Sequence, residues 1–464
     1  MPRLFVSAAH KSSGKTTVSV GIAAALRARG VVVQPFKKGP DYIDPMWLAA
    51  AAGRSCRNLD FHTMAQEEIR AEFAQRSQGA GLALVEGNKG LHDGVSVDGA
   101  DSNAALAKLL AAPVVLVVDT RGITRGIAPL LHGYREFDPG VRIAGVILNR
   151  VAGARHEGKL VHAVRTYTDL PVLGAIGRTP ELALDSAHIG LVPTAEIAET
   201  GDRVERIAQR IEADVDLDRV RGVADRAGTL DAVPAPRVRP RLASADPDVR
   251  IAVARDAAFC FYYPGDLEAL EAAGARLVAF DTLRDPAPPE ADGVFIGGGF
   301  PERAMDDLEA NAPMRVSLGE RIAAGLPVYA ECGGLMYLAR RIRWNERDCE
   351  MVGAIPADVV MHPRPRGRGY VVLEPTGDGP WAPAASGPVH AHEFHHSTLE
   401  NMAGTHWRYA YRVRRGCGID GEKDGIVIGS LLASYSHLRD VEGCRWAERF
   451  VSYVRRCKGR PIEN

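Results

Sequence analysis

Short runs of apolar residues recur along the first half of the chain, separated by stretches long enough for helices. These runs are LFVSAA (4–9), VVVQPF (31–36), LALVEG (82–87), VVLVVDT (114–120), IAGVILN (143–149) and VLGAIG (172–177). Because they are apolar throughout, they are typical of parallel strands covered by helices on both faces. Between the first two runs, apolar residues from Val18 to Leu26 recur at helical spacing, and Gly30 would end that helix.

The pattern changes around residues 215–249, which are polar, rich in proline and arginine, and without a sustained apolar face. Such a composition is typical of a linker. Apolar runs then restart at RIAVARD (250–256), RLVAF (276–280), GVFIGGG (293–299) and PVYAECGG (327–334), and a more β-rich tail follows. The sequence therefore predicts two α/β domains, residues 1–215 and 249–464, joined by a linker over 216–248.

Composition narrows the possible functions. A chain of 464 residues is too long for one ordinary core, which agrees with two domains. The net charge of −1 gives no indication of nucleic-acid binding, and the apolar run at the N-terminus is too short for a signal peptide or a membrane span. The seven cysteines are scattered without a CxxC pair, which argues against disulfides or a zinc site and favours a cytoplasmic protein.

The loop after the first predicted strand reads AAHKSSGKTT (8–17). Gly14-Lys15-Thr16 match the end of the Walker A motif, G-x-x-x-x-G-K-[ST], although Ala9 stands where the first glycine is expected. Backbone N–H groups and the helix N-terminus would bind phosphates, Lys15 would reach the outer phosphates, and Thr16 would bind Mg²⁺. A surface loop with a chance GKT is the alternative.

Charged residues gather where the next strands end. QPFKKGPDYIDP places two lysines and two aspartates at the carboxyl end of a parallel strand, where α/β sites form. Asp41 is a candidate Mg²⁺ ligand, and Lys37 or Lys38 a candidate contact to phosphate or a substrate carboxylate. Glu86 ends the third run and is a second candidate metal ligand, and Asp119 ends the fourth. Ordinary charged turns and strand-end acids are the alternatives.

AECGGLMYL (330–338) places a cysteine between a predicted strand and two glycines. A cysteine in this position can be exposed at a sharp turn with backbone N–H groups nearby, which is the geometry that a nucleophilic thiol needs. The amides of GGGFPE (297–302) would stabilise the oxyanion formed when Cys332 attacks an amide. HAHEFHHS (390–397) offers four histidines as bases and His437 is a further candidate, whereas structural roles or a metal cluster are the alternatives.

Taken together, these motifs resemble the cobyrinic acid a,c-diamide synthases. The resemblance is carried in family order by SSGKTT, FKKGPDYIDP, NLD, EG…GLHDG, AFCFYYPGDLEALEAAGA, GGGFPE, AECGGLMYL and HEFHHS, over nearly the whole chain. It implies an N-terminal domain similar to dethiobiotin synthetase that binds ATP and a tetrapyrrole, and a C-terminal domain like class I glutamine amidotransferases. In the implied reaction, glutamine supplies ammonia through a thioester, ATP phosphorylates a substrate carboxylate, and ammonia displaces the phosphate to leave an amide.

The resemblance also implies roles for individual residues. Cys332 would be the nucleophile and His395 its base, and the oxyanion and glutamine would be bound at Gly298, Gly299 and Gly333. ATP would be bound by Ser13, Gly14, Lys15, Thr16, Thr17 and Lys38. Mg²⁺ would be held by Thr16, Asp41 and Glu86. Further candidates for substrate contacts are Lys37, Tyr42, Asp44 and Lys89.

The chain departs from the family pattern in three places. Ser397 stands two residues after His395, where many class I glutaminases have glutamate; Asn88 and Lys89 replace apolar residues; and Ala187, within SAHIGLVPTAE (186–196), replaces an arginine. Losing an arginine and gaining a lysine would alter contacts to substrate carboxylates. We therefore expect sirohaem or sirohydrochlorin as the macrocycle, with neutral drift in an enzyme acting on cobyrinic acid as the alternative.

The expected partners are L-glutamine and a tetrapyrrole, without nucleic acid or membrane, and the expected assembly is a homodimer. The alternative from another class is a nucleotide-switched P-loop protein that binds a partner and carries an inactive glutaminase-like module.

Overall fold

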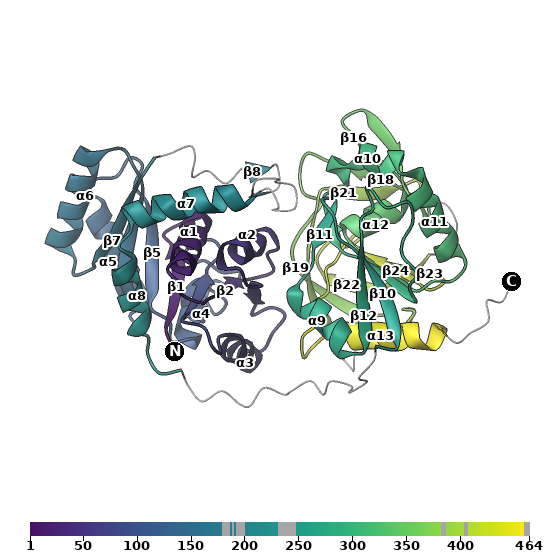
Figure 1. Cartoon of the computed structure of the whole chain (residues 1–464), viewed down its shortest axis with the longest axis horizontal. Coiled ribbons are helices and arrows are strands. Elements are labelled where there is room, and N and C mark those ends of the chain that lie inside the picture. Colours follow the sequence, from purple (N-terminus) through teal and green to yellow (C-terminus); the bar gives the residue numbers. More distant parts are fainter. Residues whose placement is uncertain are drawn as a thin grey trace. The chain divides into compact units, whose positions relative to one another are not determined.

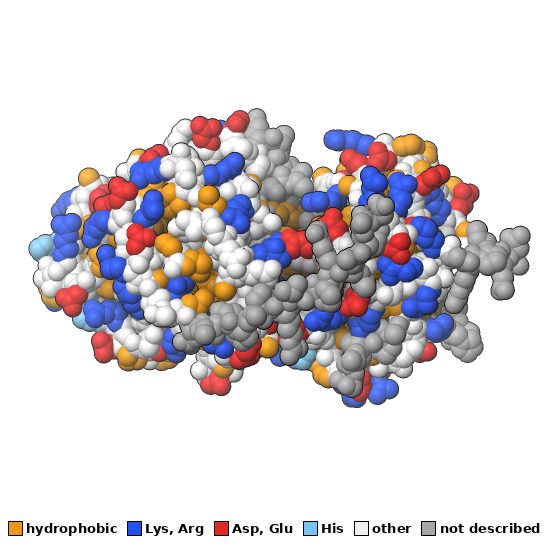
Figure 2. All heavy atoms as spheres, turned by 60° about the horizontal axis from the view of Figure 1, so that its bottom comes forward, with side chains coloured by type: hydrophobic (Ala, Val, Ile, Leu, Met, Phe, Trp, Pro, Cys, Tyr) orange, Lys and Arg blue, Asp and Glu red, His pale blue; other side chains and the backbone are white. Residues whose placement is uncertain are grey.

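The chain folds into two compact units, Met1–Arg237 and Val238–Asn464, in a computed structural model (Figure 1). The structure describes residues 1–178, the backbone of 186–187 and 190–191, and residues 200–230, 247–381, 387–402 and 407–458. No helix among these residues has the length and hydropathy needed to span a membrane. On the face drawn in Figure 2, Lys and Arg side chains are interspersed with Asp and Glu, so no large field of one sign forms there.

A seven-stranded parallel sheet forms the centre of the first unit, in the order β3-β2-β4-β1-β5-β6-β7. Its strands are β1 (Arg3–Ala8), β2 (Val33–Lys38), β3 (Arg57–Leu59), β4 (Leu82–Glu86), β5 (Val114–Asp119), β6 (Ile143–Val151) and β7 (Val172–Gly177). The apolar runs identified in the sequence overlap all of them except the short β3. The predicted α/β fold with a parallel sheet is therefore confirmed.

Helices cover both faces of this sheet, as the buried strand residues require. They are α1 (Lys15–Ala28), α2 (Ile43–Ala52), α3 (Gln66–Arg76), α4 (Asn103–Leu109), α5 (Ile127–Phe137), α6 (Ala154–Tyr167), α7 (Thr200–Asp214) and α8 (Leu217–Asp225). Alternate strand residues such as Leu4, Val6 and Val115 form one core with α1, α2, α7 and α8. The sheet thus presents the carboxyl ends of β1, β2 and β4 along a single edge, where the connecting loops carry the Walker motif and its charged neighbours.

The first residues of the predicted linker, 216–248, form a helix instead. Residue 216 is the N-cap of α8, and its carboxylate accepts a hydrogen bond from the N–H of Arg219. Leu217, Val220 and Val223 are buried in the core of the first unit. The apolar stripe of α8 is only two turns long and is interrupted by charged residues, so its period does not stand out in the sequence. Residues 231–246 of the predicted linker lie outside the described residues.

The second unit contains a nine-stranded mixed sheet, in the order β12-β10-β13-β15-β24-β23-β22-β19-β20. The first five of these strands are parallel and the rest antiparallel. They are β10 (Val249–Ala254), β12 (Ala275–Phe280), β13 (Gly293–Ile296), β15 (Val328–Glu331), β19 (Gly367–Pro375), β20 (Val389–His395), β22 (Arg408–Arg415), β23 (Lys423–Ile428) and β24 (Leu431–Ser434).

Smaller elements complete this unit. A two-stranded sheet joins β11 (Phe259–Phe261) to β14 (Gly298–Gly299), and a four-stranded sheet contains β16 (Ala339–Trp344), β17 (Arg347–Glu350), β18 (Ile355–Met361) and β21 (Ser397–Glu400). The helices are α9 (Pro264–Ala272), α10 (Met305–Ala310), α11 (Ala312–Ala323), α12 (Gly333–Leu338) and α13 (Trp446–Cys457). Because β15 and β24 pair in parallel, residues that follow each of these strands lie at the same edge of the sheet.

If α8 belongs to the first unit, Leu217→Ala should lower that unit's free energy of unfolding by about 2–4 kcal/mol, because it leaves a cavity in the core. Arg221→Ala, at an exposed position of the same helix, is the matched control and should change it by less than about 0.5 kcal/mol. Urea denaturation measures both values. Unchanged stability in Leu217→Ala would mean that the helix contributes nothing to the core.

Candidate functional site

The Walker loop connects β1 to α1. Gly14 has a φ of 89° and is the N-cap of α1, and Lys15 opens the helix with only 8% of its surface exposed. A side chain at Gly14 would collide with Nδ2 of Asn149, which donates a 2.8 Å hydrogen bond to the carbonyl of Ser13. Thr16 and Thr17 lie in the first turn of α1. The backbone at the helix N-terminus thus has the conformation that binds phosphate in such loops.

Ala9 stands where the Walker pattern has its first glycine, and its surroundings are tightly packed. Its carbonyl accepts a hydrogen bond from the Tyr134 hydroxyl. A Cβ atom at Gly90 would lie 2.8 Å from the same carbonyl. The backbone of residue 9 is therefore fixed by contacts to α5 and to the loop after β4, in a part of the motif where glycine usually provides freedom.

A cluster of charged side chains lies beside this loop. Lys37 is 2% exposed, and its Nζ lies 2.5 Å from Oδ2 of Asp44 and 2.7 Å from Oε1 of Glu86. The Thr16 hydroxyl donates to the same Glu86 oxygen at 2.9 Å. Burial alone would lower the pKa of Lys37, but the Asp44 and Glu86 carboxylates outweigh it and hold that pKa above its ordinary value. Lys37 therefore stays charged and balances the half-buried Asp44 carboxylate and the fully buried Glu86 carboxylate.

Glu86 itself has spare coordinating capacity. Within the part of the chain that the structure describes, its second oxygen, Oε2, is buried and has no hydrogen-bond partner. A buried carboxylate oxygen without a donor is expensive unless a cation reaches it. The predicted metal ligand Asp41 belongs to the same cluster, because its Oδ2 lies 3.8 Å from Nζ of Lys37. Its Oδ1 accepts hydrogen bonds from the N–H groups of Ile43 and Asp44 at the start of α2.

Lys15 and Lys37 are close enough to influence each other. Burial, and next the ammonium of Lys37, lower the pKa of Lys15 to about 8. Lys38 follows Lys37 in the same strand, so its side chain leaves on the opposite face of the sheet. Burial lowers the pKa of Lys38, and Asp60 and Asp101 are the carboxylates that oppose this effect most. The structure thus places Lys37, rather than Lys38, beside the Walker lysine.

The other predicted substrate contacts surround this cluster. Tyr42 is buried and precedes α2, and Lys89 is exposed in the loop after β4. Asn103 holds that loop, because its Nδ2 donates to the carbonyls of Asn88 and Gly90 at 2.8 and 2.6 Å. The departure at Ala187 lies in β8 (Ser186–Ala187), whose side chains are outside the described residues.

The predicted nucleophile occupies a strained turn in the second unit. Cys332 follows β15 and caps α12 with φ 47° and ψ −100°, outside the usual range for a residue with a side chain. Its N–H donates to the Ser434 carbonyl at 2.7 Å, and its Sγ contacts the Phe394 carbonyl at 3.7 Å. Burial, and next the Glu302 carboxylate, raise the pKa of this thiol. The thiol is therefore protonated at rest and needs a base.

The predicted oxyanion residues lie together beside Cys332. A Cβ atom at Gly333 would lie 3.0 Å from the backbone nitrogen of Gly299. Gly298 and Gly299 form β14, which pairs with β11. A side chain at any of these three glycines would meet a neighbouring segment at 3.0 Å or less. The close approach of the two loops thus depends on the missing side chains.

His437 is oriented by a carboxylate next to the nucleophile. Its Nδ1 lies 3.5 Å from Oε2 of Glu331, the residue that precedes Cys332. Glu331 is itself fixed, because its Oε1 accepts hydrogen bonds from the Tyr329 hydroxyl at 2.5 Å and the Leu438 N–H at 2.8 Å. A Cβ atom at Gly298 would lie 2.5 Å from Cε1 of His437 and 3.4 Å from its Nε2. The Cε1–Nε2 edge of this imidazole therefore faces the glycine loop.

His395 has a different environment. Its Nδ1 lies 2.9 Å from the Ser397 carbonyl, and its ring stacks on Tyr435 with centroids 3.8 Å apart. Its Nε2 is 3.9 Å from Oε2 of Glu393, and a side chain at Gly367 would collide with it. The contacts of His395 are those of a packed residue, whereas those of His437 match a base held by a carboxylate. Among the described residues, no group of three His, Cys, Asp or Glu side chains could hold a metal ion.

Comparison with known proteins identifies the family. Residues 2–185 match a family described as an AAA domain, and residues 250–440 match the CobB/CobQ-like glutamine amidotransferase domain. The cobyrinate a,c-diamide synthase of Magnetococcus marinus is 46% identical over 98% of this chain and 97% of its own length. Those of Methanosarcina acetivorans and Methanothermobacter thermautotrophicus are 40% and 39% identical, over 95% and 97% of this chain and 93% and 98% of their own lengths.

The chain belongs to the cobyrinate a,c-diamide synthase family. Its class of activity follows: a carbon–nitrogen ligase that uses glutamine as amido donor, with a P-loop nucleotide-binding domain. Sequence reasoning missed several residues that shape the two sites of this family member, namely Asn103, Asn149, Glu331 and Tyr134. Only Glu331 had a local signal, since it precedes the nucleophile. The other three act across 13 or more residues of sequence, so no short motif contains both partners.

For this cobyrinate a,c-diamide synthase relative, we expect His437→Asn to lower glutaminase kcat/KM by about 10²–10⁴-fold, because a general base is lost. His395→Asn is the matched control and should lower it by less than about tenfold. Glutamate release from glutamine measures both. A larger loss of kcat/KM in His395→Asn than in His437→Asn would instead identify His395 as the base.

Proposed function

We propose that this protein uses Mg²⁺, ATP and glutamine to amidate peripheral acetate carboxylates, the a and c groups, of a modified tetrapyrrole. The observation that carries the proposal is the presence of two separate sites on one chain: a cysteine with a carboxylate-oriented histidine, and a Walker loop beside buried charges. The first suits release of ammonia from an amide, and the second suits activation of a carboxylate. The name shared by the relatives, cobyrinate a,c-diamide synthase, supports a corrin-like substrate.

Release of ammonia begins when Cys332 attacks the side-chain amide carbon of glutamine. His437 takes the thiol proton through Nε2 and returns it to the leaving nitrogen, while Glu331 holds the imidazole and stabilises its charged form. Backbone N–H groups of the loops around Gly299 and Gly333 stabilise the oxyanion. Ammonia leaves, and water hydrolyses the thioester to give glutamate and the free thiol.

Activation of the acceptor takes place at the Walker loop. A tetrapyrrole carboxylate attacks the γ-phosphate of ATP, which gives an acyl phosphate and ADP. Ammonia then attacks the acyl carbon and phosphate leaves, so that the free carboxylate, a poor acyl donor, becomes an amide. Lys15 and the N–H groups at the start of α1 bind the phosphates. Lys37, which is charged and buried beside Asp44 and Glu86, would contact the incoming carboxylate or the transferring phosphate.

Mg²⁺ fits the residues beside the loop. The Thr16 hydroxyl and the Glu86 carboxylate, whose Oε2 lacks a donor within the described structure, are the hard oxygen ligands that Mg²⁺ prefers. Bound there, the ion would neutralise phosphate charge.

Lys89, exposed on the loop that Asn103 holds, would contact a substrate carboxylate. This added lysine is the reason for including sirohydrochlorin and sirohaem with cobyrinic acid as candidate substrates.

Mass spectrometry of amidated products tests the proposal. The protein, Mg²⁺, ATP and glutamine are mixed separately with sirohydrochlorin, sirohaem and cobyrinic acid, and at least one should gain one or two amides.

Cys332→Ser should lose glutamine-driven amidation and keep ammonia-driven amidation, because only the ammonia supply fails. Failure of free ammonia to rescue this variant would contradict the role of Cys332. An absence of glutaminase turnover in the parent protein would instead favour a nucleotide-switched binding protein.

The pKa of Lys15, about 8, makes ATP affinity depend on pH. Lys15 must be protonated to bind phosphate, so the dissociation constant for Mg-ATP should increase by up to about tenfold per pH unit once the pH exceeds about 8. Calorimetric titration between about pH 7 and pH 9.5 measures this slope. Lys15→Ala should bind Mg-ATP more weakly and without the slope. A slope that persists in Lys15→Ala would assign the titration to another group.

A further inference from the structure

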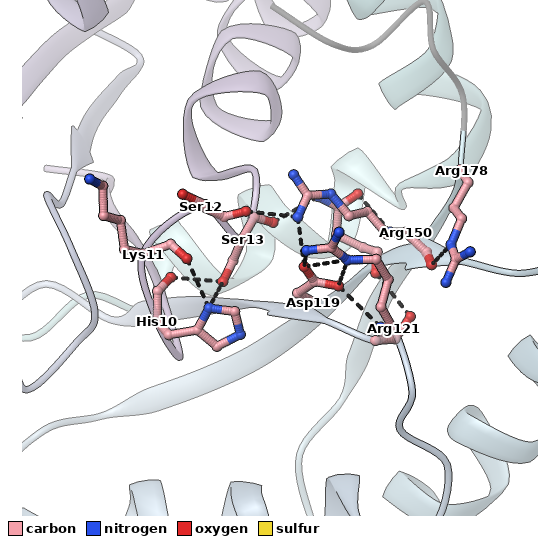
Figure 3. A network of polar contacts seen from close by, with 10 residues as sticks. His10, Lys11, Ser12, Ser13, Asp119, Arg121, Arg150 and Arg178 are labelled. Carbon is pink, nitrogen blue, oxygen red and sulfur yellow. Dashed lines mark hydrogen bonds and ion pairs between the residues drawn. The ribbon is translucent and has the colours of Figure 1, made fainter. Parts of the chain in front are cut away.

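A buried carboxylate next to the Walker loop is shared by two arginines (Figure 3). Asp119, at the end of β5, is 4% exposed. Its Oδ2 lies 2.7 Å from Nη2 of Arg121 and 2.6 Å from Nη1 of Arg150. Burial would raise the pKa of Asp119, but the hydrogen bonds from Arg121 and Arg150 lower it to about 2. The carboxylate is therefore ionised at neutral pH and holds both guanidinium groups.

Only one of the two arginines reaches the Walker loop. Nη1 of Arg150, the nitrogen that contacts Asp119, also donates to the Ser12 carbonyl at 2.8 Å. Its two hydrogens therefore bridge the end of β5 and the loop. The guanidinium of Arg121 contacts Asp119 through Nε and Nη2. In the described structure, Arg121 makes no hydrogen bond to the loop, so the two arginines differ in this one respect.

Arg150 acts beside a second residue that reaches the same loop. Asn149, its neighbour in β6, donates through Nδ2 to the Ser13 carbonyl at 2.8 Å. The Oδ1 of Asn149 accepts a 2.9 Å hydrogen bond from the Arg150 N–H, which ties the two residues together. Two consecutive residues of β6 thus hold two consecutive carbonyls of the Walker loop.

The backbone at both ends of this contact is in the left-handed region. Ser12 has a φ of 63° and Arg150 a φ of 60°. Residues other than Gly, Asn and Asp seldom adopt this conformation, and they keep it only where surrounding contacts enforce it. The Arg150 carbonyl accepts from Nε of Arg178, which supports the turn from its other side.

The orientation of the two carbonyls determines where the next N–H groups point. A trans peptide unit is planar, and its N–H points opposite to its C=O. Holding the Ser12 and Ser13 carbonyls toward β6 therefore directs the N–H groups of Ser13 and Gly14 away from β6. N–H groups of this part of a Walker loop are the ones that bind phosphate.

We propose that Arg150 is a positioning residue of the nucleotide site: anchored by Asp119, it fixes the Ser12 peptide so that the loop is preorganised for phosphate. The inference rests on the proposed binding of ATP at this loop. Without the guanidinium, ATP itself would have to order the loop when it binds. Part of its binding free energy would be used for this, so the affinity for ATP should fall. The effect should fall on ATP affinity and on KM for ATP, not on turnover at saturating ATP.

Calorimetric titration of the full-length protein with Mg-ATP tests this role. Arg150→Gly removes the guanidinium yet tolerates a positive φ, so it separates the lost contact from backbone strain. We expect Arg150→Gly and Asp119→Ala each to weaken Mg-ATP binding by about tenfold or more, and the double variant to lose little beyond the single ones. Arg150→Lys, which keeps a cation near Asp119, should have an intermediate affinity. Arg121→Ala is the matched control and should stay within about twofold of the parent.

Steady-state amidation adds a readout that a general loss of stability would not give. KM for ATP should rise in Arg150→Gly, while kcat at saturating ATP and glutaminase kcat/KM stay unchanged. Binding of Mg-ATP to Arg150→Gly and Arg150→Lys as tight as in the parent would overturn the inference, as would an equal loss in Arg121→Ala. Undiminished binding in Lys15→Ala would instead refute the nucleotide site itself, so the two failures are distinguishable.

Discussion

Hydrogen bonds between buried side chains and the loop backbone fix the conformation of the loops at both sites. Loops that leave the carboxyl end of a sheet lose their ladder partners, and their carbonyls need other donors. Three buried asparagines provide them in the first unit. Asn58 donates to the carbonyls of residues 39 and 41, Asn103 to those of residues 88 and 90, and Asn149 to that of Ser13 in the Walker loop. An asparagine amide suits this task, because it has two N–H donors in a short, rigid group.

In the second unit the hydrogen bonds run the other way, because carboxylates accept from loop N–H groups that have lost their ladder partners. Asp424 is fully buried and accepts from the N–H groups of Tyr435 and Ser436, both at 3.0 Å. Glu331 accepts from the N–H of Leu438. These contacts bracket His437 on both sides, while its own N–H donates to the carbonyl of His392 at 2.8 Å. The histidine that we propose as base is therefore fixed through its backbone as well as through its ring.

The sequence was informative wherever a signal was local. The apolar runs predicted β1, β2, β4, β5, β6 and β7, and the Walker loop was found because its residues are contiguous. The three residues of β3 are too few to show a period, and the short stripe of α8 was hidden within a charged stretch. Contacts between distant segments left no such signal: Lys37 meets Glu86 across 49 residues, and Asn149 meets Ser13 across 136.

The comparison of His395 with His437 shows why contacts between distant segments matter for the assignment of a base. HEFHHS draws attention by its density of histidines, yet a base needs one imidazole with one orienting partner. The parallel pairing of β15 with β24 places Glu331 opposite Ser434, so that the segment after β24 passes beside the nucleophile.

Backbone strain in these loops also shows that contacts between distant segments determine their conformation. Cys332, Ser12 and Arg150 all have positive φ, at a cost of about 1–3 kcal/mol each. A single hydrogen bond contributes about 0.5–1.5 kcal/mol, so one contact does not offset the cost. Cys332 has its N–H bonded to Ser434, and its two following glycines allow the close approach of the neighbouring loops. Several contacts therefore act together to hold the backbone conformation at each strained residue.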